Sequence, residues 1–122
     1  MKHSPAFLAL VTAVRARVRE VTVEETRAKL RAGAPVVLVD VREDREWAAG
    51  HAAGARHLGK GIIERDIEAA VPEKDAEVIL YCGGGFRSVL AADALQQMGY
   101  TNVVSMLGGW RGWTEAGAPT ER

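Results

Sequence analysis

Short apolar runs alternate with amphipathic or alanine-rich stretches along most of the chain. Two of these runs are continuous: residues 36–39 (Val-Val-Leu-Val) and residues 78–81 (Val-Ile-Leu-Tyr). Uninterrupted runs of branched and aromatic residues are typical of strands that are buried on both faces of a parallel sheet. Residues 56–58 and 103–104 predict two further short strands. Strands are therefore predicted at intervals throughout the chain.

The segments between these strands favour helices. Thr22 and Glu25 form a capping box that begins a helix through Leu30, and Gly33 is placed to end it. Further helices are predicted over residues 43–47, 59–71, 89–95 and 110–116, with a turn at 50–54. This alternation of strands and helices predicts an α/β fold with a parallel sheet. The two ends, residues 1–4 and 118–122, are expected to be loose.

The apolar stretch at residues 5–14 imitates a short signal peptide. Three arginines follow it at once, however, and no small-x-small cleavage site ends the run. Apolar side chains recur at helical spacing at Phe7, Val11, Val14 and Val18. We therefore predict an amphipathic N-terminal helical extension over residues 1–19, too short to span a bilayer. Its apolar stripe is expected to pack on the domain's own sheet or, alternatively, on a partner or a second copy, which would give a homodimer.

Net charge, cysteine count and histidine spacing limit which partners, cellular compartment and cofactors are expected. The 122 residues include 16 basic and 16 acidic side chains, so net charge favours neither a nucleic acid nor a membrane surface as partner. The single cysteine cannot form an internal disulfide, which fits a reducing, cytoplasmic setting. The three histidines are scattered and lack zinc-site spacing, so neither a metal nor a cofactor is expected.

That one cysteine, Cys82, lies where the strand at 78–81 ends. Gly83, Gly84 and Gly85 follow it, then Phe86, Arg87 and the predicted helix. Three glycines allow the backbone N–H groups to converge on the sulfur, and Gly84 is expected to need a positive φ. The helix N-terminus and Arg87 add positive charge at the same point, which favours the reactive thiolate. The alternative is an inert buried cysteine, which is common for a lone thiol.

The spacing of the loop separates two kinds of cysteine chemistry. Arg87 is five residues after Cys82, one fewer than in the Cys-x5-Arg loop of cysteine-dependent phosphatases. A loop of this size surrounds a sulfur atom on the cysteine but crowds a phosphate. The spacing therefore disfavours a phosphatase or an arsenate reductase.

The loop resembles the active-site loop of rhodanese-like sulfurtransferases, Cys-x-x-Gly-x-Arg-Ser, with Cys82, Gly85, Arg87 and Ser88 in the defined positions. Residues 38–43, 46–47 and 50–55 resemble the first signature of that family. Residues 99–100, 103–104 and 107–110, with Trp113 and Gly117, resemble its C-terminal signature. The resemblance extends over about residues 20–119, which we take as one rhodanese-like domain.

The resemblance implies a three-layer fold with a mainly parallel five-stranded sheet flanked by helices. It also implies a single-domain sulfurtransferase, in which the Cys82 thiolate takes sulfur from a donor such as thiosulfate or 3-mercaptopyruvate. The resulting persulfide would pass to cyanide, a thiol or a protein acceptor. Gly83 and Gly84 stand where dedicated thiosulfate-using members carry cationic side chains. The rival hypothesis is a non-catalytic or redox-sensing interaction module.

Roles of the remaining loop residues stay open at this point. Arg87 either holds the loop by bonding its carbonyl groups or faces the pocket and binds an anionic donor. Ser88 is expected to be the helix N-cap rather than a catalytic group, with a hydrogen bond to Cys82 as an additional role. Phe86 is expected to be exposed at the pocket mouth, where it screens the persulfide or contacts an acceptor.

Three residues outside the loop are candidates for supporting roles. Asp40 and Arg42 lie at the carboxyl end of the strand at 36–39, where functional loops of parallel sheets meet. They form either a buried ion pair or, in the alternative, a pair in which Arg42 points at the substrate. His51 is expected to bond the backbone across a turn rather than act as a base for Cys82.

Overall fold

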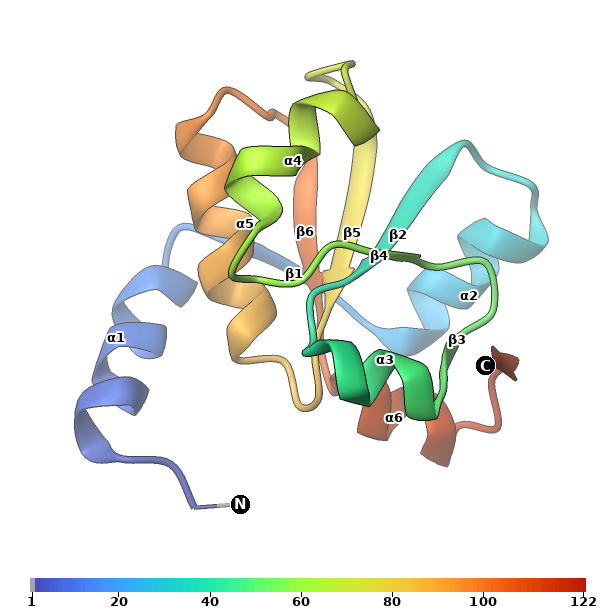
Figure 1. Cartoon of the computed structure of the whole chain (residues 1–122), viewed down its shortest axis with the longest axis horizontal. Coiled ribbons are helices and arrows are strands. Elements are labelled where there is room, and N and C mark those ends of the chain that lie inside the picture. Colours follow the sequence, from blue (N-terminus) through green and yellow to red (C-terminus); the bar gives the residue numbers. More distant parts are fainter. Residues whose placement is uncertain (1) are drawn as a thin grey trace.

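The computed structural model describes residues 2–122 and contains a five-stranded sheet in the order β1-β6-β5-β2-β4. Every neighbouring pair in this sheet is parallel (Figure 1). The strands are β1 (Arg19–Val21), β2 (Val36–Asp40), β4 (Arg56–His57), β5 (Glu77–Tyr81) and β6 (Val103–Met106). The two continuous apolar runs of the sequence are the adjacent central strands β2 and β5, as expected for strands buried on both faces.

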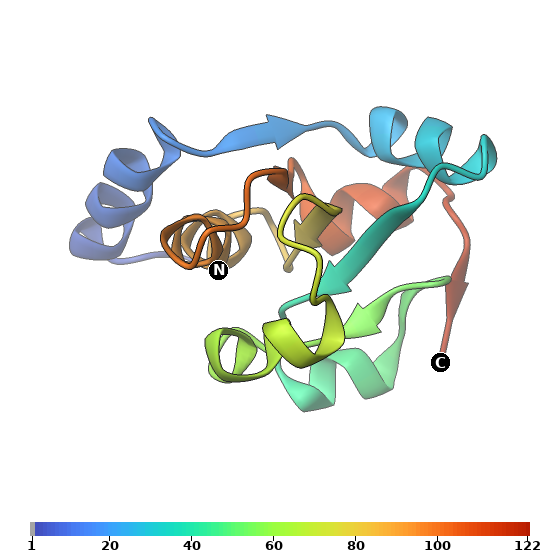
Figure 2. The same cartoon turned by 90° about the horizontal axis from the view of Figure 1, so that it is seen from above.

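Helices cover both faces of the sheet and give the predicted three layers. Figure 2 shows α1, α5 and α4 on one side and α2 and α6 on the other. The helices are α1 (Pro5–Arg15), α2 (Val23–Arg31), α3 (Asp44–Ala49), α4 (Ile63–Ala70), α5 (Arg87–Gln97) and α6 (Gly109–Glu115). The capping box of Thr22 and Glu25 begins α2 as predicted, and Gly33 follows the helix with φ +72°.

Side chains of β5 alternate between two apolar cores. Val78 and Leu80 pack with α4 and α5, whereas Ile79 and Tyr81 pack with residues of α2 and α6. All four side chains are fully buried. β5 is therefore packed on both faces up to its last residue, Tyr81, and Cys82 follows directly after it.

Helix α1 packs on α5 rather than directly on the sheet (Figures 1 and 2). Val11 and Val14 are buried in this contact. The Arg17 guanidinium also donates two hydrogen bonds to Asp93 of α5, at 2.7 and 3.1 Å. Because α5 covers the apolar stripe, a homodimer through α1 would need its outer face, and it stays a prediction. The division into an extension at 1–19 and a domain at 20–119 also stays a prediction.

The expectation that residues 118–122 are loose is wrong. β7 (Thr120–Glu121) pairs antiparallel with β3 (His51–Ala52), and Ala118 is buried. The Trp113 indole anchors the segment by donating a hydrogen bond to the Pro119 carbonyl at 2.7 Å.

The other end is also ordered in the part described. The Ser4 hydroxyl caps α1, and His3 packs on Phe7; Met1 lies outside the described residues. Over residues 2–122, no helix combines the length and the apolar character needed to cross a membrane.

Candidate active site

Cys82 lies immediately after β5, with 1% of its surface exposed. The Gly85 backbone N–H donates a hydrogen bond to its Sγ atom at 3.1 Å. Gly85 adopts φ +104°, a conformation that side-chain-bearing residues rarely adopt, whereas Gly84 has no positive φ. The expectation for Gly84 is therefore wrong: the special backbone conformation falls one residue later, at the glycine whose N–H reaches the sulfur.

Ser88 is not the helix N-cap. Helix α5 begins at Arg87, its N-cap position is Phe86, and Ser88 is already a fully buried helical residue. The Ser88 hydroxyl lies 3.5 Å from Cys82 Sγ and 2.8 Å from the Ser105 hydroxyl. A chain of two hydroxyl groups thus leads from β6 to the thiol. Ser105 was not among the predicted site residues, although it is the one polar residue within the apolar strand at 103–106.

The N-terminus of α6 binds the active-site loop through two backbone hydrogen bonds. The Trp110 N–H donates to the Cys82 carbonyl at 2.7 Å, and the Arg111 N–H donates to the Gly83 carbonyl at 3.1 Å. Gly109 permits this approach, because a Cβ atom there would lie 2.3 Å from the Cys82 carbonyl oxygen. In the sequence, the two consecutive glycines at 108 and 109 were the available signal for this contact. Both adopt a positive φ in the structure.

Arg87 is held by Glu46 of α3, a residue that the sequence analysis did not assign to the site. Its guanidinium makes two contacts with the carboxylate, at 2.9 and 3.2 Å. These hydrogen bonds lower the pKa of Glu46 and raise that of Arg87. In this structure the Arg87 guanidinium therefore bonds Glu46 rather than the loop carbonyls, and it lines the pocket with its charge compensated. Binding of an anionic donor by Arg87 stays a prediction.

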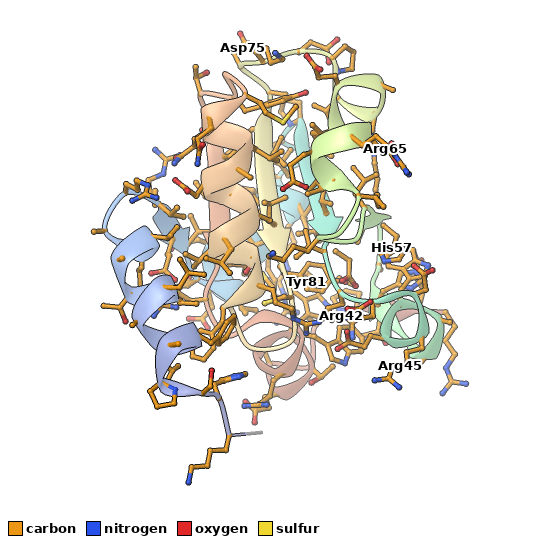
Figure 3. The ribbon with its side chains drawn as sticks, turned by 60° about the vertical axis from the view of Figure 1, so that its left-hand side comes forward. Arg42, Arg45, His57, Arg65, Asp75 and Tyr81 are labelled. Carbon is orange, nitrogen blue, oxygen red and sulfur yellow. The ribbon has the colours of Figure 1, made fainter. Side chains whose placement is uncertain are left out.

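Asp40 and Arg42 form the buried ion pair of the structural alternative. The Arg42 guanidinium bonds both Asp40 carboxylate oxygens at 2.8–3.1 Å and the Gly50 carbonyl at 2.7 Å. It lies 4.6 Å from the Trp110 ring centroid, and Figure 3 shows it in the interior near Tyr81. Burial lowers the pKa of Arg42, but the hydrogen bonds to Asp40 and the charges of nearby acidic groups together outweigh burial and raise it overall. Arg42 thus connects β2, the Gly50 turn and α6.

His51 bonds the backbone as expected. Its Nδ1 atom lies 3.1 Å from the Trp47 carbonyl oxygen, and its ring stacks on Trp47 with a centroid distance of 3.4 Å. His57 stacks on Trp47 at 4.9 Å. Two histidines thus use Trp47 as a packing surface, and neither lines the pocket that contains Cys82.

Phe86 is half-buried rather than exposed, because the N-terminal segment packs on it. His3 and Phe7 place their rings 4.9 and 6.2 Å from the Phe86 ring. The Arg15 guanidinium lies 5.4 Å from the same ring centroid. The N-terminal helix therefore reaches the active-site loop, a contact that nothing in the sequence pattern of either segment indicates.

These segments line a half-open pocket of about 780 Å³ that contains Cys82. In Figure 1 the β5–α5 connection, α3, α6 and the start of α1 lie at the same end of the molecule. The pocket is lined by Lys2, His3, Ser4, Phe7, Glu43, Arg45, Glu46, Cys82, Gly83, Gly84, Phe86, Arg87 and Arg111. Within residues 2–122 no group of three or more metal-ligating side chains gathers. The site thus offers one nucleophile, one directed N–H group and several cations.

The family model of the rhodanese-like domain matches residues 22–116. Fold, loop and match agree, and the chain belongs to the rhodanese-like family. A thiosulfate sulfurtransferase from Haemophilus influenzae, GlpE, is 34% identical over 103 residues, which cover 84% of this chain and 94% of that protein. Most of the chain is thus similar to nearly the whole of a protein named as a thiosulfate sulfurtransferase.

Two other similarities widen this comparison. The probable adenylyltransferase/sulfurtransferase MoeZ of Mycobacterium tuberculosis is 32% identical over 81% of this chain, which spans only 25% of that longer protein. A Rhodopseudomonas palustris structure of unknown function, described as a possible tyrosine phosphatase, matches with a TM-score of 0.88 and 29% identity. That match covers 99% of this chain and 98% of the other, so it extends to the N-terminal helix.

Proposed function

We propose that this protein is a sulfurtransferase that carries sulfane sulfur as a Cys82 persulfide. The Cys82 thiolate attacks the outer sulfur of a donor such as thiosulfate, and the S–S bond of the donor breaks. Sulfite leaves with the bonding electron pair, and Cys82 keeps the terminal sulfur as a persulfide anion. A thiolate or cyanide then attacks that terminal sulfur, which releases Cys82 as thiolate. No external oxidant or reductant is required.

The observation that carries this proposal is the 3.1 Å hydrogen bond from the Gly85 N–H to Cys82 Sγ inside a pocket. A backbone donor aimed at a sulfur atom stabilises negative charge there, first on the thiolate and later on the persulfide. The α5 N-terminus adds partial positive charge at the same place. An inert structural cysteine needs neither an N–H donor nor an adjoining pocket.

Intact-mass measurement under non-reducing conditions tests the proposal. The purified protein is incubated with thiosulfate and, separately, with 3-mercaptopyruvate. We expect a gain of one sulfur atom, its removal by cyanide, and no gain in Cys82→Ser, whose hydroxyl fits the same space. Sulfur transfer by Cys82→Ser would contradict the mechanism.

The second candidate is an interaction module in which Cys82 has no transfer role. Exposed Leu107, beside the loop-binding end of α6, is the feature that favours it. A Cys82 that gains no sulfur from either donor or from inorganic polysulfide would favour this module. Hydrolysis of an aryl phosphate would instead support a phosphatase, which the loop spacing disfavours. We propose a cytoplasmic setting, because a reactive unpaired thiol persists in a reducing compartment.

A further inference from the structure

The Cys82 pocket is far larger than an inorganic sulfur donor requires. Its volume is about 780 Å³, whereas pockets of roughly 300–1,000 Å³ hold organic ligands of drug size. An ion of the size of thiosulfate would leave most of this space to water. The pocket therefore has room for an organic substrate of the size of a short peptide.

The charges that line the pocket favour an anion. Arg87 is compensated by Glu46, so the loop itself offers no free cation. Three other cations, Lys2, Arg45 and Arg111, line the same pocket, and none forms an ion pair among residues 2–122. Glu43 is the only carboxylate of that lining outside the Arg87–Glu46 pair. The uncompensated charge of the described lining is thus positive.

Each of these three cations either contacts the active-site loop or is the chain neighbour of a residue that does. Lys2 precedes His3, whose ring packs on Phe86. Arg45 precedes Glu46, which binds Arg87, and Figure 3 shows Arg45 on α3. The Arg111 backbone N–H binds the Gly83 carbonyl. Three segments that are distant in sequence therefore each bring a free cation to the nucleophile.

We infer that Lys2, Arg45 and Arg111 select a sulfur acceptor that is an organic thiol bearing carboxylate groups. This inference rests on the proposed sulfurtransferase function. The acceptor thiolate attacks the terminal sulfur of the Cys82 persulfide, the S–S bond breaks, and Cys82 leaves as thiolate. The product is the acceptor's persulfide anion, so charge and electrons balance. The carboxylates of the acceptor bind the cations while its thiol reaches Cys82.

Single-turnover transfer from the preloaded protein tests the inference. Inorganic polysulfide loads Cys82 without any requirement for a natural donor, and intact mass verifies the added sulfur after excess reagent is removed. The probe thiols are glutathione, a tripeptide with two carboxylates, and its diethyl ester, which has nearly the same size but no free carboxylate. The readout is the ratio of their second-order transfer rate constants.

We expect glutathione to react about tenfold faster than its diester, and this ratio to fall as ionic strength rises. Arg45→Gln and Arg111→Gln should each lower the ratio about threefold, and the double variant should bring it close to one. The matched control is Arg31→Gln, an exposed arginine of α2 outside the pocket, which should keep the wild-type ratio.

Equal rates for the two probes, or a ratio that Arg45→Gln and Arg111→Gln leave unaltered, would overturn this inference and leave the proposed function standing. A wild-type protein that polysulfide cannot load at Cys82 would overturn the proposed function, and this inference with it.

Discussion

Arg87 and Glu46 form a two-point ion pair that joins the active-site loop to α3, with Nη1–Oε1 and Nη2–Oε2 distances of 2.9 and 3.2 Å. Forty-one residues separate the two side chains in sequence. The pair compensates the cation that the loop carries and fixes the distance between the loop and the helix that bears Arg45. The Arg87–Glu46 pair therefore affects both the stability of the fold and the charge in the Cys82 pocket.

Glu46→Gln should lower the melting temperature at neutral pH. Loss of a partly buried two-point pair costs about 1 kcal/mol, which corresponds to a decrease of about 5 °C for a domain of this size. Because Arg87 holds the pKa of folded Glu46 below its ordinary value of 4.5, the pair stabilises the fold fully above pH 4.5. This contribution is lost as pH falls through the lowered pKa.

Thermal melts of wild type and Glu46→Gln between pH 3 and 7 check this expectation. The difference between the two melting temperatures should be largest at neutral pH and should shrink at the acidic end. Glu115→Gln, an exposed substitution on α6, is the control and should melt like wild type throughout. A difference that grows on acidification would show that Glu46 does not act through its charge.

Gly85→Ala should impair sulfur transfer more than Gly84→Ala. Both positions have room for a methyl group, but Gly85 has φ +104° and Gly84 has no positive φ. Forcing alanine into that conformation costs about 1–3 kcal/mol, and relaxing it turns the N–H away from the sulfur. The rate of persulfide formation, measured by intact mass, should fall at least tenfold for Gly85→Ala and stay near wild type for Gly84→Ala. The reverse order would contradict the assignment of Gly85 as the sulfur-binding amide.

Gly109→Ala should disrupt the site from a position on another helix. Its methyl group would lie 2.3 Å from the Cys82 carbonyl oxygen, so the α6 N-terminus must move and weaken the Trp110–Cys82 hydrogen bond. Overpacking and the positive φ together cost about 2–4 kcal/mol. Urea denaturation measures this loss, with Gly61→Ala as control, because nothing lies within 4 Å of a methyl group there. Equal stability of the two variants would contradict the claim that the close approach of α6 to Cys82 stabilises the site.

Asp40→Asn should be among the most destabilising single substitutions. It leaves the buried Arg42 guanidinium without its counter-charge, and breaking a buried pair on one side costs about 3–5 kcal/mol. Denaturant unfolding checks this value. Asp66→Asn, which removes the carboxylate of the exposed Arg65–Asp66 pair, should leave stability unchanged within error. A similarly small effect at Asp40 would mean that the Arg42 charge is solvated.

The local parts of the fold could be read from the sequence, because their causes are local. The run of apolar residues that ends at Cys82, the capping box of Thr22 and the helix after the glycines each depend on neighbouring residues. The parts that could not be predicted are contacts between distant segments. Glu46 reads as an ordinary helix-surface carboxylate until α3 is placed beside the loop, and His3 looks like part of a loose end until α1 is placed on α5.

Two errors at the site have the same physical origin. Ser88 resembles an N-cap by residue type, but the helix starts at Arg87, and its N-cap residue Phe86 makes no side-chain cap hydrogen bond. Gly84 and Gly85 are the same residue type in the sequence, and only the folded structure shows that Gly85 takes the positive φ, beside the backbone of Met106 and Gly108. Residue identity therefore located the nucleophile, whereas the geometry around it depended on segments far along the chain.

The bonds from the α6 N-terminus to the Cys82 and Gly83 carbonyls also set the order in which the site can assemble during synthesis. A nascent chain that contains the loop from Cys82 to Ser88 but ends before Gly109 lacks the α6 N–H groups that bind the Cys82 and Gly83 carbonyls. The loop can therefore complete its hydrogen bonds only after the segment that follows β6 has been synthesised.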